Sequence, residues 1–207
     1  MKSKICLIRH GITEGNKRKL YYGHSDIDLA PEGVEELKAQ AASGMYPNGD
    51  GADFYTTDLK RTQQTLKLIY GEREFTPMAS LKEINFGDFE MKTYQELKDL
   101  EEYQEWLRNP KDDTLAPPNG ESLREFYERI VAGFEDLRSR HALKELKMRH
   151  KDDEALSIVV CHGGTISAVM QDIFPGEKDN FYQWIPDPGH GYILTLEDGK
   201  VTAADPF

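Results

Sequence analysis

Short strand-like runs separated by longer segments of helical periodicity form the pattern of this chain. Residues 4–8 (KICLI) and 53–57 (DFYTT) predict two short strands. Residues 156–160 (LSIVV) predict the most deeply buried strand, because the run is apolar, β-branched and free of polar alternation. Near the C-terminus, the Asp-Gly pair at 198–199 is a strong two-residue turn signal and predicts a hairpin over 191–204.

Helices are predicted between these strands. A loop and a helix are expected over 28–44, with Pro31 in the first turn and Gly44 as the stop. A second helix is expected to begin at Asp58, whose side chain would cap it. Further helical periodicity covers 93–108, 122–148 and 163–174.

Strands that alternate with helices predict an α/β fold, here a three-layer α/β/α sandwich with a mostly parallel central sheet. The C-terminal hairpin would add antiparallel strands at an edge of that sheet. We find no internal repeat and no interdomain linker, so 1–207 is expected to be a single domain. The acidic, aromatic and Pro-rich region 85–121 is expected to be an excursion from the core, a lid or insertion over the site.

Charge and cysteine usage narrow the class of protein. Lys and Arg number 26 against 37 Asp and Glu, a formal net charge of −11, which disfavours nucleic acid and anionic membranes as partners. No stretch approaches the roughly 20 apolar residues that span a bilayer, and the N-terminal apolar run is too short for a secretory segment. Cys6 and Cys161 both lie in apolar strands, so we expect a cytoplasmic protein with two buried thiols.

Polar and charged side chains follow the predicted strands, at the edge where open α/β sheets bind ligands. The first strand ends in Arg9 and His10. The second leads through Thr57 to Arg61 on the next helix, and the strand at 156–160 leads to His162. A loop adds the candidate Glu83.

This set of side chains suits a phosphoryl group. Arginine is a rigid fork of donors that matches phosphate oxygens, and Gly163 and Gly164 at a helix start leave backbone N–H groups open to an anion. A neutral histidine can be a covalent nucleophile, and neighbouring arginines disfavour its protonation. Glu83 is the candidate acid for a leaving alkoxide.

Five segments, in this order, resemble the histidine phosphatase superfamily in its phosphoglycerate-mutase-like branch. They are LIRHGITEGN (7–16), TTDLKRTQQT (56–65), LKEINFGDFE (81–90), PPNGES (117–122) and VVCHGG (159–164). The resemblance spans almost the entire chain and implies a phosphoglycerate-mutase-like fold.

The resemblance implies a role for each of five catalytic candidates. His10 would be the nucleophile that becomes phosphohistidine, with Arg9 and Arg61 as paired phosphate clamps. His162 would stabilise the transferring group, and Glu83 would act as general acid and later as base for water. The family's mechanism implies no metal, and we expect no cofactor.

Four further residues are candidates for binding the substrate. Asn16 matches a secondary phosphate contact of the family, and the backbone N–H of Gly163 is a further donor. His24 lies in a loop that could line the pocket entrance. Tyr22 belongs to an aromatic group that could contact the organic part of a substrate or simply pack in the core.

Two positions depart from the family pattern and bear on the substrate. Ile12 stands where members often carry Glu or Gln, and Met91 stands where Gly often follows Glu90. The acid-donor segment and PPNGES are most similar to alpha-ribazole phosphatase and related small-molecule phosphatases. The implied activity is therefore metal-independent hydrolysis of a small phosphate ester, alpha-ribazole 5'-phosphate being one candidate.

Two other functions stay open at this point. One is a cofactor-dependent phosphoglycerate mutase, although such mutases usually have a longer chain and an extra segment after the acid-donor motif. The other is a non-catalytic phosphate-ligand binding protein of the same fold. A zinc site is disfavoured, because an arginine beside a cation is unfavourable. His141 and His150 are expected at solvated helix positions, and the protein is expected to be a monomer or a homodimer.

Overall fold

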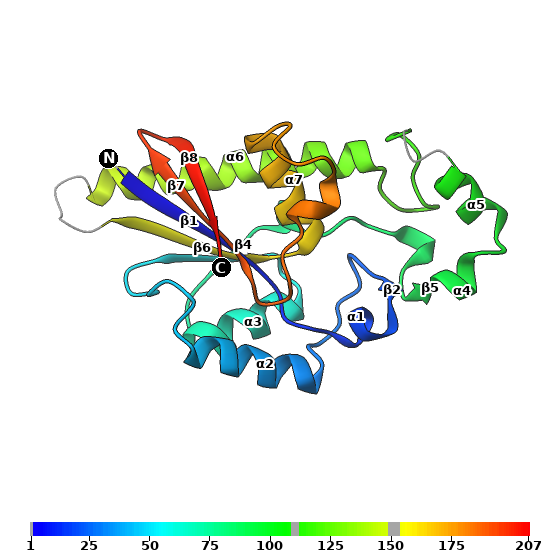
Figure 1. The fold of residues 1–207 in the computed structure, drawn as a ribbon, viewed down its shortest axis with the longest axis horizontal. Helices are drawn as coiled ribbons and strands as arrows, with labels where there is room; N and C mark the ends of the chain where they lie inside the picture. The colour runs from blue at the N-terminus through cyan, green and yellow to red at the C-terminus, as the bar shows by residue number, and fades with distance from the viewer. Residues whose placement is uncertain (1, 109–111, 149–153) are drawn as a thin grey trace.

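A six-stranded sheet forms the centre of the protein, with strand order β4-β3-β6-β1-β7-β8 (Figure 1). The computed structural model describes residues 2–108, 112–148 and 154–207. The strands of this sheet are β1 (Lys2–Arg9), β3 (Asp53–Thr56), β4 (Thr76–Pro77), β6 (Ala155–Cys161), β7 (Gly191–Glu197) and β8 (Lys200–Pro206). A separate pair joins β2 (Leu20–Tyr21) to β5 (Lys92–Thr93).

The strand directions confirm a mostly parallel sheet. β1 is parallel to β6, with Arg9 opposite Cys161, and β6 is parallel to β3. The predicted hairpin is also confirmed, because β7 and β8 are joined through the turn at 198–199 and pair antiparallel. Of the two hairpin strands only β8 lies at an edge of the sheet, since β7 lies between β8 and β1.

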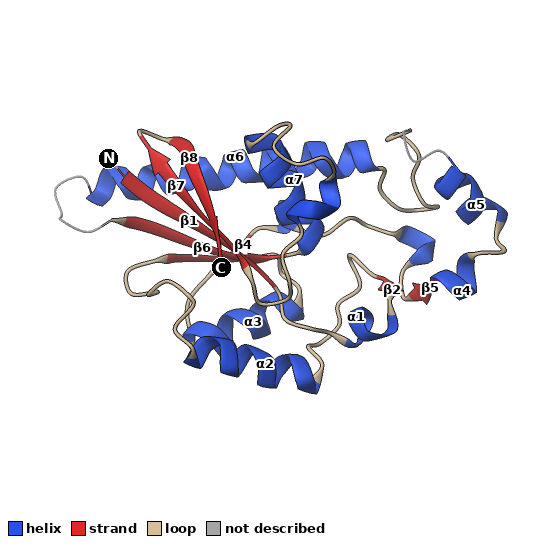
Figure 2. Ribbon diagram, in the orientation of Figure 1, coloured by secondary structure: helices blue, strands red, loops and turns tan. Residues whose placement is uncertain are grey.

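Helices cover both faces of the sheet and confirm the three layers (Figure 2). α2 (Pro31–Ala42) and α3 (Lys60–Tyr70) lie on one face, while α6 (Leu123–Met148) and α7 (Gly163–Ile173) lie on the other. The core beneath α6 and α7 contains Phe126, Ile130 and Val169, and the core on the other face contains Phe54 and Leu66. No helix of the described residues is long and apolar enough to cross a membrane.

The predicted boundaries of the first two helices are confirmed for α2 and wrong for the cap of α3. Pro31 is the first residue of α2, and Gly44 follows its end with φ +76°, a backbone conformation that glycine adopts without strain. The prediction that the Asp58 side chain caps α3 is wrong. Asp58 itself takes φ +66°, Leu59 occupies the cap position, and the backbone N–H of Lys60 donates to Asp26 at 2.7 Å.

Residues 85–121 leave the sheet after Glu83 and rejoin it at α6. They contain β5, the short helices α4 (Tyr94–Leu97) and α5 (Glu101–Arg108), and a small apolar cluster of Phe89, Leu97 and Tyr103. The helical pattern predicted over 93–108 is divided between α4 and α5, and Tyr103 of α5 packs on Phe89. That this excursion closes over the site stays a prediction. One-turn 3-10 helices at Ala79–Leu81, Gly87–Phe89 and Phe181–Trp184 and the short helix α1 (Glu14–Arg18) complete the chain.

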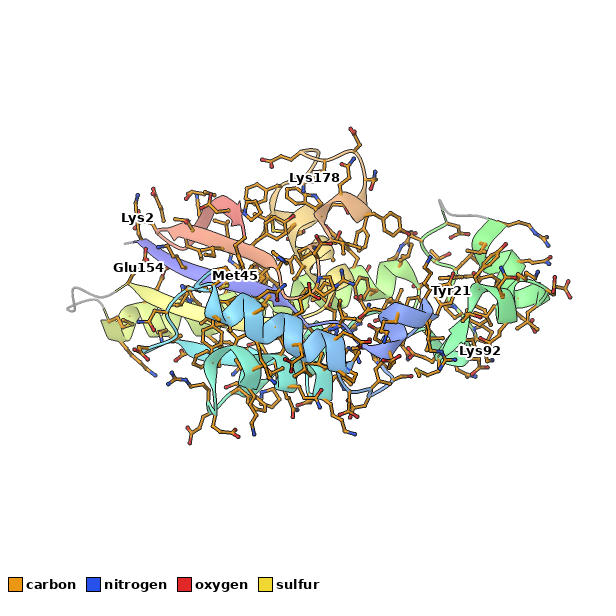
Figure 3. The ribbon with its side chains drawn as sticks, turned by 60° about the horizontal axis from the view of Figure 1, so that its bottom comes forward. Lys2, Tyr21, Met45, Lys92, Glu154 and Lys178 are labelled. Carbon is orange, nitrogen blue, oxygen red and sulfur yellow. The ribbon has the colours of Figure 1, made fainter. Side chains whose placement is uncertain are left out.

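A buried histidine lies at the end of the sheet where β1 and β6 begin. The prediction of a solvated helix position for His141 is wrong. The side chain is buried against the sheet, where it hydrogen-bonds Ser157 at 2.8 Å and Ser3 at 2.9 Å. Figure 3 shows this end, marked by Lys2 and Glu154, far from the end marked by Tyr21 and Lys92. His150 lies outside the described residues.

Both thiols are buried, as expected, and they belong to the cores of opposite faces. Burial raises the pKa of Cys6 and of Cys161, so both stay protonated at neutral pH.

Candidate active site

Four of the five predicted catalytic side chains line one cavity of about 460 Å³ at the carboxyl ends of the central strands. They are Arg9, His10, Arg61 and Glu83. The fifth, His162, is fully buried behind His10, and the two imidazole rings meet edge to face with centroids 5.2 Å apart. The fold therefore brings together segments spread over most of the chain.

His10 follows the last residue of β1, and its ring is oriented by its own neighbour. The Nδ1 atom lies 2.7 Å from the backbone carbonyl of Gly11. A carbonyl only accepts, so Nδ1 carries the proton and Nε2 of the neutral ring holds a free lone pair. Burial, and after it the charge of Arg61, hold the pKa of His10 well below its ordinary value, which keeps this imidazole neutral.

Arg9 and Arg61 present positive charge without a carboxylate partner within the described residues. Arg9 donates through Nη1 to the carbonyl of Pro186 at 2.7 Å. Arg61 is fully buried, stacks over the ring of Tyr22 at 5.1 Å, and donates only to backbone carbonyls. The Nε atoms of both arginines have no hydrogen-bond partner in the described chain. Unneutralised guanidinium groups of this kind suit an anion.

His162 is held by a threonine from the neighbouring strand. Its Nε2 lies 2.7 Å from the hydroxyl of Thr57, which follows β3, and its buried Nδ1 has no partner among the described residues. Burial, then Arg61 and His10, lower the pKa of His162. Thr57 sits at a strand end, where the sequence suggested a site residue, but only the packing of β3 against β6 identifies its partner.

Glu83 is anchored at the N-terminus of α7. Its Oε2 accepts the backbone N–H of Gly164 at 2.8 Å, and its Oε1 accepts that of Ile84 at 3.1 Å. Burial raises the pKa of Glu83, while these N–H groups and the two arginines oppose that shift. The net direction favours a protonated carboxyl that can act as an acid.

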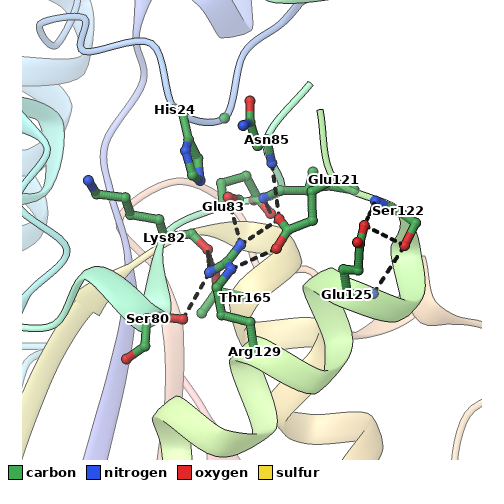
Figure 4. A network of polar contacts seen from close by, with 12 residues as sticks. His24, Ser80, Lys82, Glu83, Asn85, Glu121, Ser122, Glu125, Arg129 and Thr165 are labelled. Atoms are coloured by element: carbon green, nitrogen blue, oxygen red, sulfur yellow. Dashed lines mark hydrogen bonds and ion pairs between the residues drawn. The ribbon is translucent and has the colours of Figure 1, made fainter. Parts of the chain in front are cut away.

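A residue that was not among the predicted site residues supports the segment that carries Glu83. Arg129 on α6 donates to the carbonyls of Ser80, Lys82 and Glu83, and pairs through two bonds of 2.7 and 2.8 Å with Glu121 (Figure 4). Glu121 lies in the PPNGES segment, one of the five that resemble the family. A bidentate pair of this type holds the acid-donor segment rigidly.

The predicted substrate-binding residues fall into two groups. Asn16 and Gly163 line the cavity, as does Tyr22. The side-chain carbonyl of Asn16 accepts from Thr13, which leaves its NH2 group to face a ligand. His24 is exposed and does not line this cavity, although it lies near Lys82 at the edge of the same network (Figure 4).

The outer part of the cavity is apolar and aromatic. Its wall includes Tyr21, Phe86, Trp106, Leu115, Phe181 and Tyr182. Apart from Arg9 and Arg61, no Lys or Arg is among the described residues that line it, and Asp112 is the only further charged side chain besides Glu83. Nowhere in the described residues do three or more His, Cys, Asp or Glu side chains gather as a metal site.

Comparison with known proteins places this arrangement in a family. Residues 5–205 match the histidine phosphatase superfamily (branch 1). The adenosylcobalamin/alpha-ribazole phosphatase of Escherichia coli (strain K12) is 26% identical, over 90% of this chain and 86% of that protein. A 2,3-bisphosphoglycerate-dependent phosphoglycerate mutase of Bartonella tribocorum is 30% identical, over 82% and 81%. The alpha-ribazole phosphatase structure from Shigella flexneri shares the fold, with TM-score 0.74, 23% identity, and 96% and 93% coverage.

Proposed function

Because this chain belongs to the histidine phosphatase superfamily, we propose that it hydrolyses a small phosphate monoester, without a metal, through a phosphohistidine intermediate. One observation carries the proposal. A buried, neutral His10 with its Nε2 free shares a cavity with two arginines that lack carboxylate partners in the described chain and with a carboxyl of raised pKa.

The first half of the reaction transfers the phosphoryl group to the enzyme. Nε2 of His10 attacks phosphorus as the bond to the leaving oxygen breaks, and Glu83 protonates that oxygen. Arg9, Arg61 and His162 stabilise the charge on the equatorial oxygens. The NH2 group of Asn16 adds a neutral donor.

The second half returns the enzyme to its starting state. Glu83, now a carboxylate, takes a proton from water, and the oxygen attacks phosphorus as the bond to Nε2 breaks. Inorganic phosphate leaves, His10 recovers its lone pair, and Glu83 is again protonated. One acid–base residue and one nucleophile therefore complete the cycle.

The apolar outer wall favours hydrolysis over a mutase reaction. A bisphosphate cofactor carries a second phosphate, and that group would face an aromatic wall with no further cation among the described lining residues. An uncharged, apolar or aromatic organic group fits the wall better. Alpha-ribazole 5'-phosphate, which joins an aromatic base to a ribose phosphate, is a substrate of this kind, and relatives of this chain are named for it.

The test is hydrolysis of p-nitrophenyl phosphate in the presence of EDTA, with the wild type beside His10→Ala. We expect turnover by the wild type and none by the variant, together with a phosphohistidine trapped by rapid alkaline quench. Wild-type turnover that survives His10→Ala would overturn the covalent mechanism.

A second set of assays separates the competing functions. Alpha-ribazole 5'-phosphate is expected to be hydrolysed with a higher kcat/KM than 3-phosphoglycerate. Isomerisation of 3-phosphoglycerate that depends on added 2,3-bisphosphoglycerate would instead establish a mutase. Tight binding of phosphate with no turnover of any ester would establish a binding protein.

A further inference from the structure

Glu90 is the acceptor for an unusual number of donors from one short loop. Its carboxylate accepts the backbone N–H groups of Gly23, His24 and Ser25 at 2.9, 3.0 and 3.0 Å, and the Ser25 hydroxyl at 2.6 Å. A fourth N–H, from Phe86, binds the same carboxylate at 3.0 Å. Although burial opposes ionisation, these hydrogen bonds lower the pKa of Glu90, so it stays a carboxylate at neutral pH.

The carbonyls of the same loop hold Arg61. The guanidinium donates through Nη1 to the carbonyl of Ser25 at 2.8 Å and through Nη2 to that of Gly23 at 2.6 Å. Loop 23–25 therefore turns its N–H groups to Glu90 and its carbonyls to Arg61.

One peptide unit links the two charges directly. The peptide between Gly23 and His24 gives its C=O to Arg61 and its N–H to Glu90. Its dipole is thus aligned between a guanidinium and a carboxylate, and each hydrogen bond polarises the other. Arg61 is fully buried and forms no ion pair with a carboxylate within the described chain, and this peptide connects its guanidinium to the charge of Glu90.

The loop has little freedom to move away from either partner. A Cβ on Gly23 would lie 1.6 Å from the carbonyl oxygen of Ile84, so the loop backbone is packed against the segment that follows Glu83. Glu90 binds both this loop and Phe86 of that segment. Its carboxylate therefore connects the loop that holds Arg61 to the segment that follows Glu83.

We propose that Glu90 is a positioning residue for Arg61, acting as its counter-charge through the backbone of residues 23–25. An amide in place of the carboxylate would remove the negative charge and turn an NH2 group toward N–H and O–H donors that need an acceptor. The loop would then move and shift the guanidinium from its place beside the phosphoryl group. This inference rests on the proposed function for its effect on turnover, but not for its effect on anion binding.

The experiment compares Glu90→Gln with Glu96→Gln. Glu96 is a matched control, because it accepts the backbone N–H and the hydroxyl of Thr93 in the same excursion but forms no hydrogen bond with loop 23–25. The readouts are kcat and KM for p-nitrophenyl phosphate, the affinity for inorganic phosphate measured by calorimetry, and the melting temperature.

We expect Glu90→Gln to lower kcat/KM by about tenfold or more and to weaken phosphate binding by a similar factor, while Glu96→Gln changes neither. The same substitution in an Arg61→Gln background should cost less than about twofold further, because residues that act through one another are not additive. Ser25→Ala, which removes one donor only, should shift phosphate affinity in the same direction by a smaller factor.

Several outcomes would overturn the inference. A lowered melting temperature with unchanged phosphate affinity would show a purely structural role for Glu90. An equal loss with and without Arg61 would show that the two act independently. Phosphate affinity is measured without turnover, so an enzyme that proves inactive on every ester would refute the proposed function and leave this test intact.

Discussion

Gly164 donates its backbone N–H to Oε2 of Glu83 across 2.8 Å, although 81 positions separate the two residues in the chain. The contact sets the carboxyl against the first turn of α7, immediately after the second histidine of the site. It also leaves no room between them, because a Cβ on Gly164 would lie 2.3 Å from Oε1 of Glu83.

Gly164→Ala is therefore expected to displace the acid and leave the nucleophile in place. We expect kcat for an alkyl phosphate to fall by about a hundredfold, and kcat for p-nitrophenyl phosphate by much less, since a good leaving group needs little protonation. Steady-state kinetics on both substrates would check this. Equal losses on the two esters would mean that the substitution disturbs the phosphate site itself.

The pH profile of kcat/KM should be bell-shaped. His10 must be neutral, and its pKa is lowered from 6.5, so activity should persist below pH 6.5 and fall only as the pH drops through the lowered value. Glu83 must be protonated, and its pKa is raised from 4.5, so activity should fall as the pH rises through that higher value. The alkaline limb should disappear in Glu83→Gln, and a limb that survives belongs to another group.

The aromatic mouth of the cavity should discriminate between organic groups. Tyr182 lines the cavity and is 77% exposed, so its truncation should not disturb the core. Tyr182→Ala is expected to raise KM for naphthyl phosphate by about three- to tenfold and to leave KM for glycerol phosphate unchanged. Tyr94→Ala is the control, because Tyr94 is exposed on α4 and does not line this cavity. The prediction fails if both variants, or both substrates, respond alike.

Acid should destabilise the fold through a histidine remote from the site. Burial lowers the pKa of His141 below 6.5, so the unfolded chain binds its proton more readily than the folded protein does. The contribution of His141 to stability is therefore present above pH 6.5 and is lost as the pH falls below it. In His141→Gln, the pH dependence of the unfolding free energy between pH 6.5 and the lowered pKa should be shallower by about 1.4 kcal/mol per pH unit. Urea unfolding across pH 5–7 measures this slope, and parallel slopes would contradict the prediction.

Met91 holds a backbone conformation that suits glycine. Its φ is +61° and its side chain is 40% exposed, so little packing is lost when it is removed. We expect Met91→Gly to raise the unfolding free energy by up to about 1 kcal/mol. Met91→Ala keeps the Cβ and should not stabilise, so chemical denaturation of the two variants separates backbone strain from loss of the side chain.

Local chemistry explains what could be predicted from the sequence. The strand at 156–160, the stop at Gly44 and the hairpin turn at 198–199 depend on neighbours a few residues away, and each is confirmed. The alternation of strands and helices leads to the parallel sheet, whose carboxyl ends share one edge. That edge is why His10 and Arg61 could be placed in one site before any contact was known.

Partners distant in the chain account for what was missed. The cap of α3 comes from Asp26 and not from the adjacent Asp58, and His141 is buried because α6 crosses the starts of β1 and β6. Two residues that hold the site carry no periodic signal in the sequence: Arg129, which donates to the carbonyl of Glu83, and Glu90, which accepts from loop 23–25. Each binds backbone groups that only tertiary packing brings within reach.

The sequence by itself determined which groups we propose to react, because their chemistry is a property of the residue types and of their place after each strand. Only the tertiary structure decided the protonation of those groups and the atoms that hold them. A pKa depends on burial and on charges from other segments, and hydrogen bonds such as Gly164 to Glu83 exist only when the chain is folded.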